Sequence, residues 1–198
     1  MQFEIIGLGR EGWSSFQFLL QLLESVTHFV LVDDLAINQL PNHWRTVVEN
    51  NDNQVTFLTS ETFLARPPAN IDAAVITPGI PPSHPVAAWL DRAQVFQTSN
   101  TQLFLDIVLP DRATKTPFTA FLPHLNQQPT IIGVTGTKGK STTTAAIHHV
   151  LSASGKTAWL GGNIGTAPLD LLSKIEASTT AESYVALELS AHQLARLT

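Results

Sequence analysis

The chain has 198 residues, of which 43% are hydrophobic and 14% are charged, and its formal net charge is -5. This composition supplies a hydrophobic core for one large domain or two small ones and excludes a disordered charged tail. The net negative charge, with Lys and Arg scattered along the sequence, argues against a surface that binds nucleic acid. The sequence contains no cysteine, which excludes disulfides, thiolate catalysis and cysteine-ligated metals.

The first 32 residues predict neither a signal peptide nor a membrane span. Met1 leads directly into the apolar residues 3–6, without the basic start and long apolar run of a signal peptide. The most apolar region, residues 16–32, is interrupted by polar side chains and is too polar to span a bilayer. We therefore expect a cytoplasmic protein that does not associate with membranes.

The first half of the chain alternates short apolar runs with helical patterns. The apolar runs predict strands at residues 3–6, 29–32, 55–58, 73–76 and from Val95-Phe96. Apolar residues at helical spacing predict helices at about 13–23 and 84–92. Strands that alternate with helices predict an α/β fold with a doubly wound parallel sheet.

Residues 106–129 break this alternation, because Pro110, Pro117 and Pro123 stand among polar residues there, and we expect a linker or an insertion. A second α/β unit follows, with strands expected at 130–134, 157–160 and 184–189 and a helix at about 140–152. The predicted organisation is a Rossmann-like domain at 1–105, the linker or insertion at 106–129, and an incomplete phosphate-loop domain at 130–198. Three strands are too few for a stable sheet of this class, so we expect a fragment of a longer protein.

A glycine-rich turn follows the first predicted strand. Gly7-Leu8-Gly9-Arg10-Glu11-Gly12 matches the dinucleotide fingerprint, and Asp33 lies about twenty residues further on, at the end of the second strand. The glycines allow a tight turn and close approach of a phosphate to the helix N-terminus. The turn predicts nucleotide binding, with an NAD-dependent oxidoreductase as one alternative and a turn needed only for packing as another.

A second glycine-rich segment, Gly133-Val134-Thr135-Gly136-Thr137-Lys138-Gly139-Lys140-Ser141, lies between a predicted strand and a helix. Backbone N–H groups of such a loop surround a phosphate, Lys140 would neutralise the β- and γ-phosphate oxygens, and Ser141 would place its hydroxyl on Mg²⁺. The spacing departs from the general phosphate loop, because Val134 stands where that pattern has its first glycine. The alternative is a chance cluster of small residues.

Ionisable residues downstream of this loop are further candidates. Glu188 ends an apolar strand, where phosphate-loop proteins carry a carboxylate that binds Mg²⁺ or orients water, although it could also be a surface glutamate. His148 and His149 are adjacent on a helix, so they face different directions and are better explained as solvated or packing residues than as a metal pair. His192 could reach the same cleft as Glu188 or lie on a helix surface.

Three ordered motifs resemble those of the Mur ligase family. The segment Thr135–Thr142 resembles the family's ATP loop, whose spacing departs from the general pattern in the same way. Gly161-Gly162-Asn163-Ile164-Gly165, and then Leu187-Glu188-Leu189-Ser190 with Gln193-Leu194, are similar to the next two motifs. In the N-terminal part, the turn at Gly7, Val32-Asp33-Asp34 and Thr77-Pro78-Gly79-Ile80-Pro81 with His84-Pro85 resemble the members that add D-glutamate.

The resemblance implies roles for individual residues. It implies ATP binding by Gly136, Thr137, Lys138, Gly139, Lys140, Ser141 and Thr142, with Lys140 and Glu188 as catalytic residues. It implies that Ser141 and Glu188 hold Mg²⁺. It implies that the sugar-nucleotide substrate contacts Gly9, Arg10, Glu11, Asp33, Asp34, Thr77, Pro78, Gly79, Asn163 and Ser190, with Glu11 and Asp34 contributing backbone N–H groups.

The activity implied by the resemblance is ATP-dependent amide ligation in peptidoglycan precursor synthesis. The substrates would be UDP-N-acetylmuramoyl-L-alanine, ATP and D-glutamate, the cofactor Mg²⁺, and the protein a monomer. The family's D-glutamate domain, its Mg²⁺-binding histidine and its carbamoylated lysine would lie beyond Thr198, so we expect this chain alone to be inactive. The alternatives are an L-alanine-adding Mur ligase and a module that binds nucleotides without catalysis. Many members of that family carry an acidic pair before the Leu-Phe that stands here at positions 103 and 104, whereas in this sequence Asn100 and Gln102 stand nearby.

Overall fold

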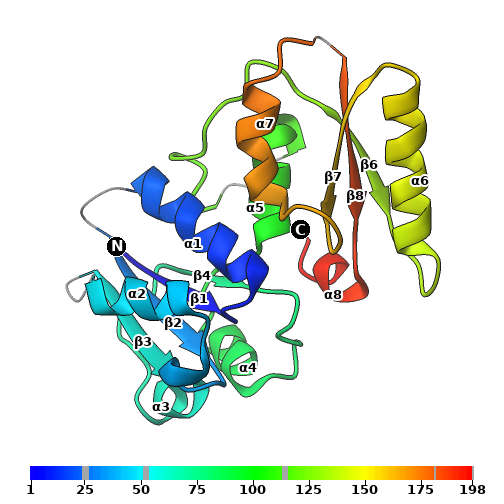
Figure 1. Ribbon diagram of the computed structural model, residues 1–198. Helices are drawn as coiled ribbons and strands as arrows, with labels where there is room; N and C mark the ends of the chain where they lie inside the picture. Colours follow the sequence, from blue (N-terminus) through cyan, green and yellow to red (C-terminus); the bar gives the residue numbers. More distant parts are fainter. Residues whose placement is uncertain (24–26, 51–53, 113–115, 181, 198) are drawn as a thin grey trace. The chain divides into compact units, whose positions relative to one another are not determined.

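The computed structural model describes residues 1–23, 27–50, 54–112, 116–180 and 182–197. The chain forms two compact α/β units (Figure 1). The first unit comprises Met1–Asn100 with Thr116–Phe121, and the second comprises Thr101–Lys115 with Leu122–Thr198. The predicted domain boundaries, with a linker at 106–129, remain predictions. Within the described ranges, no helix combines the length and the apolar character needed to cross a bilayer.

The first unit is built on a parallel five-stranded sheet in the order β3-β2-β1-β4-β5. Its strands are β1 (Gln2–Ile6), β2 (His28–Asp33), β3 (Val55–Thr59), β4 (Ala73–Ile76) and β5 (Gln97–Thr98). Its helical segments are α1 (Arg10–Leu23), η2 (Ile37–Gln39), α2 (Asn42–Asn50), α3 (Ser60–Ala65) and α4 (Pro85–Arg92). This arrangement confirms the predicted parallel α/β fold.

Helices cover both faces of this sheet, which explains why its strands are continuous apolar runs. On one face, aromatic rings from β1, β2, α1 and α2 pack together, as in the contacts of Phe16 with Phe29 and Trp44. On the other face, Phe63 of α3 and Leu90 of α4 are fully buried in one cluster with β-strand side chains. Burial of each such side chain contributes about 1.5–3 kcal/mol, so the two apolar faces position the loops at the strand ends.

The second unit contains a parallel three-stranded sheet in the order β6-β8-β7. Its strands are β6 (Thr130–Val134), β7 (Thr157–Gly162) and β8 (Ser183–Glu188). The helical segments from Asn100 onward are α5 (Asn100–Val108), η3 (Pro110–Arg112), α6 (Lys140–Ala153), η4 (Pro168–Leu171), α7 (Leu172–Glu176) and α8 (Ala191–Leu194).

Register in this second sheet brings three loops to one edge. Val134 at the end of β6 and Gly162 at the end of β7 are both paired with Glu188 at the end of the central strand β8. Because all three strands are parallel, the loops that follow them leave from the same carboxyl edge.

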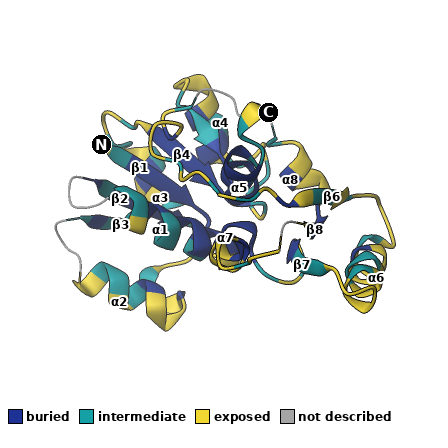
Figure 2. Ribbon diagram, turned by 90° about the horizontal axis from the view of Figure 1, so that it is seen from above, coloured by how far each residue is buried: buried dark blue, intermediate teal, exposed yellow. Residues whose placement is uncertain are grey.

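The residues of helix α6 are mostly exposed or of intermediate burial, whereas those of strands β1 and β4 are mostly buried (Figure 2).

The structure differs from the sequence-based expectation at the fifth strand. We predicted a strand from Val95-Phe96, whereas β5 comprises only Gln97–Thr98. The N–H of Val95 donates to Leu90 O at 3.0 Å, which ends α4, so Val95 belongs to the helix exit. The hydrogen bonds to the neighbouring strand β4 begin at Phe96, whose O accepts from Ala74 N at 2.9 Å. The helices α2, α3, α5 and α7 were not predicted individually.

Candidate functional site

The glycine-rich loop of the second unit joins β6 to α6. Gly136 has φ 145° and Gly139 has φ 77°, and Gly139 is the N-cap residue of α6. A left-handed backbone costs an L-residue roughly 1–2 kcal/mol, which accounts for glycine at position 139. The loop residues 135–139 are exposed, and the first N–H groups of a helix form a favourable environment for an anion. The loop therefore has the local features of a phosphate-binding segment.

Two residues of α6 contact the backbone near this loop. Lys140 Nζ donates to Gly136 O at 2.9 Å, so the ammonium group lies beside the loop. Thr144 is fully buried and its hydroxyl donates to Lys140 O at 2.8 Å. Ser141, the predicted Mg²⁺ ligand, is exposed in the first turn of α6. The predicted ATP-binding residues are thus contiguous at the start of this helix.

Glu188 ends the central strand and is only 1% exposed. Its Oε1 accepts a hydrogen bond from Asn163 Nδ2 at 2.7 Å, whereas Oε2 is buried and has no hydrogen-bond partner among the described residues. A buried carboxylate oxygen normally has a partner, and a cation would provide one. This orphaned oxygen fits the predicted Mg²⁺ ligand. The described residues contain no cluster of three or more His, Cys, Asp or Glu side chains.

The loop after β7 packs directly against Glu188. Gly162 has φ 99°, and a Cβ atom at this position would lie 2.2 Å from Glu188 O. The next residue, Asn163, donates its backbone N–H to the same Glu188 O at 3.0 Å. Only glycine permits this approach, so Gly162 determines how Asn163 reaches Glu188.

We predict that Gly162→Ala destabilises the chain by more than about 3 kcal/mol or prevents folding, because the new methyl group would collide with backbone. Gly155→Ala is the matched control, since Gly155 also has positive φ, 75°, but a Cβ there would meet nothing within 4 Å. The control is expected to lose only about 1–2 kcal/mol. Urea unfolding measures the loss of stability in each variant. Equal losses in Gly162→Ala and Gly155→Ala would contradict the proposed collision.

Ser190, predicted to contact the substrate, has a structural role at the start of α8. Its Oγ accepts from Gln193 N at 3.1 Å, and Gln193 Oε1 accepts from Ser190 N at 2.8 Å. These reciprocal bonds form a capping box. Gln193 is fully buried and its Nε2 also donates to Thr101 Oγ1 at 3.3 Å. His192 lies exposed on this short helix, and His148 Nε2 lies 3.2 Å from Ala158 O.

The glycine-rich turn of the first unit lies at the carboxyl edge of its own sheet. Gly7 has φ 87°, and a Cβ at Gly12 would lie 2.2 Å from Gly7 O, so α1 approaches the turn closely. A Cβ at Gly9 would meet nothing within 4 Å, and Gly9 is exposed. A side chain at Gly7 would meet Thr77 Oγ1 at 2.2 Å. The turn thus combines tight packing at two glycines with open backbone at the third.

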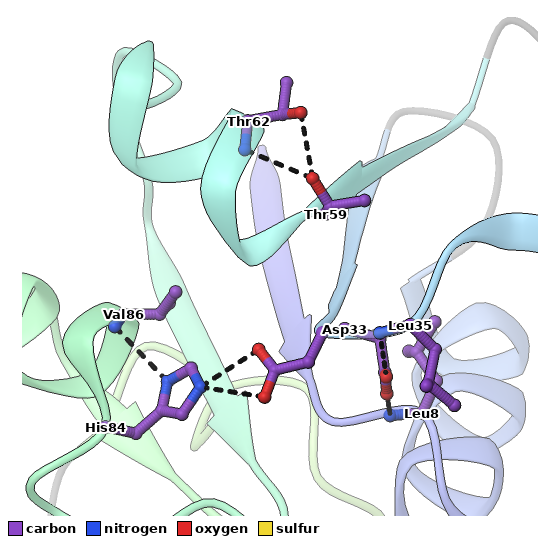
Figure 3. A network of polar contacts seen from close by, with 8 residues as sticks. Leu8, Asp33, Leu35, Thr59, Thr62, His84 and Val86 are labelled. Atoms are coloured by element: carbon purple, nitrogen blue, oxygen red, sulfur yellow. Dashed lines mark hydrogen bonds and ion pairs between the residues drawn. The ribbon is translucent and has the colours of Figure 1, made fainter.

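Asp33 holds this turn through backbone hydrogen bonds. Its Oδ2 accepts from Leu8 N at 2.7 Å and its Oδ1 accepts from Leu35 N at 3.0 Å (Figure 3). Leu8 O in turn accepts from Trp44 Nε1 at 2.7 Å. Sequence reasoning placed Asp33 beside a ligand and assigned no role to Trp44, because the contacts between these distant positions have no local signal. In the structure both residues fix the conformation of the turn.

We predict that Asp33→Ala lowers the free energy of unfolding by about 2 kcal/mol, because hydrogen bonds to a charged group are lost. Asp91→Ala provides a control, since Asp91 has an exposed contact with Gln97 Nε2. That control is expected to change stability by less than about 0.5 kcal/mol. Urea denaturation of the two variants tests the difference, and an Asp33→Ala protein as stable as the control would contradict it.

The side chains of Asp34 and His84 contact each other beside the turn. His84 Nε2 lies 3.1 Å from Asp34 Oδ1. His84 Nδ1 accepts from Val86 N at the start of α4 (Figure 3). A hydrogen bond from Ser60 and then the contact with His84 hold the pKa of Asp34 below its ordinary value. The Asp34 side chain is 63% exposed. Its carboxylate therefore stays charged next to the turn.

The remaining residues predicted to contact the sugar nucleotide lie around the same turn. Thr77 N donates to Ile6 O at 3.0 Å, and Thr77 O accepts from Ile80 N at 3.1 Å, which forms the turn containing Pro78 and Gly79. Gly79 and Arg10 are exposed, whereas Glu11 is 7% exposed. The contact of Glu11 with the substrate through its backbone N–H remains a prediction.

Asn100 also contacts the N-terminal part of α1. Its Nδ2 lies within 3.1 Å of the hydroxyl oxygens of Ser14 and Ser15 and 3.3 Å from Glu11 O. Asn100 is 1% exposed. Its amide therefore stabilises the helix that follows the glycine-rich turn.

Comparison with known proteins identifies relatives along most of the chain. Residues 134–198 match the model of the Mur ligase middle domain. The chain is 32% identical over 194 residues to UDP-N-acetylmuramoylalanine--D-glutamate ligase of Synechococcus sp. (strain CC9605), covering 96% of this chain and 37% of that protein. The protein of the same name from Rickettsia felis (strain ATCC VR-1525 / URRWXCal2) is 31% identical over 192 residues, covering 96% of this chain and 34% of the relative.

A further relative has a different acceptor in its name. UDP-N-acetylmuramoyl-L-alanine--L-glutamate ligase of Salinispora tropica (strain ATCC BAA-916 / DSM 44818 / JCM 13857 / NBRC 105044 / CNB-440) is 39% identical over 130 residues. That match covers 66% of this chain and 23% of the relative. The chain spans about a third of the length of the first two relatives.

Proposed function

We propose that this chain, which belongs to the Mur ligase family, contributes the ATP loop and the sugar-nucleotide pocket of a ligase for peptidoglycan precursors. The observation that carries the proposal is the common edge of the second sheet. There the glycine-rich loop after Val134 and the orphaned Glu188 oxygen end neighbouring, paired strands. A phosphate-binding loop beside a carboxylate suited to a cation is the arrangement that phosphoryl transfer requires.

The proposed reaction joins glutamate to UDP-N-acetylmuramoyl-L-alanine. The alanyl carboxylate attacks the γ-phosphorus of ATP, the bond to the β-phosphate oxygen breaks, and ADP leaves. The glutamate amine then attacks the acyl phosphate, loses a proton, and the tetrahedral intermediate expels phosphate. Lys140 and the loop N–H groups would stabilise negative charge on the transferred phosphoryl group. Ser141 and Glu188 would hold Mg²⁺, which when bound neutralises phosphate charge.

The sugar nucleotide is proposed to bind at the glycine-rich turn of the first unit. Gly9 offers open backbone for the diphosphate, and α1 begins at Arg10. The N-terminus of this 14-residue helix favours negative charge. The charged Asp34 carboxylate would repel a diphosphate, so a ligand at this position is expected to contact its backbone or a sugar hydroxyl.

Isothermal titration calorimetry with UDP-N-acetylmuramoyl-L-alanine tests the pocket on this chain. We expect binding without release of ADP when ATP is added, because the proposed activity requires parts of the longer relatives. A folded chain that gives no heat with this ligand would contradict the pocket. Preference for UDP-N-acetylmuramate lacking alanine would indicate the L-alanine-adding reaction, and binding of NADH in place of UDP compounds would indicate an oxidoreductase.

The name of the Salinispora tropica relative supports one alternative acceptor, L-glutamate. A protein that extends to the length of the relatives would distinguish the two enantiomers by its rate of phosphate release with D-glutamate and with L-glutamate. Faster turnover with D-glutamate is expected from the two relatives that match 96% of this chain. Faster turnover with L-glutamate would favour the alternative.

A further inference from the structure

Asn163 is joined to Glu188 at two points. Its backbone N–H donates to Glu188 O at 3.0 Å, and its side-chain Nδ2 donates to Glu188 Oε1 at 2.7 Å. The preceding Gly162 brings the two backbones together, with positive φ and no room for a side chain. The position of the Asn163 amide is therefore determined by the same strand end that carries the carboxylate.

The two carboxylate oxygens of Glu188 have different environments. Oε1 is held by the Asn163 amide, whereas Oε2 is buried and has no hydrogen-bond partner among the described residues. Because a carboxylate only accepts hydrogen bonds, the amide must present its NH₂ group to Oε1. This contact fixes the rotation of the carboxylate and leaves Oε2 as the oxygen available to a cation.

We propose that Asn163 is a positioning residue that holds Glu188 so that Oε2 faces the Mg²⁺ of the ATP site, an inference that rests on the proposed function. Hydrogen bonds from neighbouring groups orient metal-ligating carboxylates and raise metal affinity. Asn163 itself is exposed, while Glu188 is 1% exposed. Water could solvate the amide in the absence of this contact, so the hydrogen bond mainly serves the buried carboxylate.

This role differs from the one that the sequence resemblance implies for Asn163, which is contact with the sugar nucleotide. The two roles predict different losses when the amide is removed. A positioning residue affects metal affinity and leaves nucleotide affinity in the absence of metal unchanged. A sugar-nucleotide contact affects the affinity for UDP-N-acetylmuramoyl-L-alanine.

The experiment compares wild-type chain, Asn163→Ala and Asn126→Ala. Asn126 is an exposed amide that precedes β6, at the end of that strand opposite the loop, and serves as the control. Mn²⁺ affinity is measured by electron paramagnetic resonance with saturating ADP. Calorimetry gives the affinities for ADP in EDTA and for UDP-N-acetylmuramoyl-L-alanine, and thermal unfolding shows whether each variant is folded.

For Asn163→Ala we expect Mn²⁺ affinity to fall roughly 10- to 100-fold, the range observed when such supporting groups are removed. Affinities for ADP without metal and for the sugar nucleotide should match those of Asn126→Ala. Unchanged Mn²⁺ affinity, or a loss confined to the sugar nucleotide, would overturn the inference. A wild-type chain that binds ADP but does not bind Mn²⁺ would overturn the inference about Asn163 and leave the proposed function standing. A wild-type chain that binds neither ADP nor the sugar nucleotide would overturn the proposed function.

Discussion

Replacing Lys140 by alanine is expected to weaken ATP binding to this chain by roughly 10- to 100-fold, because charge-assisted hydrogen bonds contribute about 1.5–3 kcal/mol. The Lys140 ammonium group already lies beside the glycine-rich loop, 2.9 Å from Gly136 O. Phosphate oxygens would replace this carbonyl as acceptors when ATP binds. Calorimetric titration with ATP and Mg²⁺ measures the effect.

Lys174→Ala is the matched control for this prediction. Lys174 is an exposed lysine in the last turn of α7, so its replacement removes the same charge from the same unit at a position outside the loop. ATP affinity should remain within about twofold of wild type, since an exposed charge is screened by solvent. Equal losses in the two variants would show that Lys140 acts only through net charge.

Lys140→Ala is expected to abolish turnover in a protein that extends to the length of the relatives. The loss should be several kcal/mol of transition-state stabilisation, as is typical when a charge-stabilising group is removed. Binding of UDP-N-acetylmuramoyl-L-alanine should remain nearly intact. Turnover like that of wild type would refute the catalytic role of Lys140.

The sequence predicted the buried strands well because parallel strands covered on both faces are continuous apolar runs. Strands β1, β2, β4 and β6 begin and end within about one residue of the predicted ranges. Helix α2 was missed because most of its nine residues are polar and only Trp44 among them is buried, so the segment has few apolar residues to mark it. Strand β5 was misplaced because two paired residues carry almost no pattern.

The candidate site was predictable only in part. The glycine-rich loop and Glu188 were found from motifs, because each is defined by neighbouring residues. The contact of Asn163 with Glu188, and that of Leu8 with Asp33, join positions 25 residues apart. Such contacts depend on strand order, since Gly162 and Glu188 meet only when β7 pairs with β8. No local pattern reveals that pairing.

The burial of Glu4 is a feature that the sequence does indicate. It lies in β1, the central strand of the first sheet, and is fully buried. A glutamate between Phe3 and Ile5, in a strand expected to be covered on both faces, indicates a buried carboxyl group. Burial is the main cause that raises its pKa from 4.5 to about 8, and the nearby Asp72 raises it further. The Gln2 amide, which donates to Glu4 Oε1 at 3.0 Å, opposes the shift.

Replacing Glu4 by glutamine is therefore expected to stabilise the chain increasingly as the pH rises. The pKa of Glu4 is higher in the folded state than in the unfolded state, so the folded state binds more protons between pH 4.5 and about 8. The wild-type chain consequently loses stability across this range, by roughly 3–5 kcal/mol in total. Glutamine cannot ionise, so the variant escapes this loss.

Urea unfolding of wild type and Glu4→Gln at pH 5, 7 and 9 measures the difference in the free energy of unfolding at each pH. The comparison isolates Glu4, because groups that titrate equally in both proteins, including Asp34 with its lowered pKa, cancel. Glu49→Gln is the control, since Glu49 lies near the end of α2 and is exposed. The stability difference between Glu4→Gln and wild type should grow from pH 5 to pH 9, and a constant difference would show that the buried carboxyl group does not change its proton binding on folding.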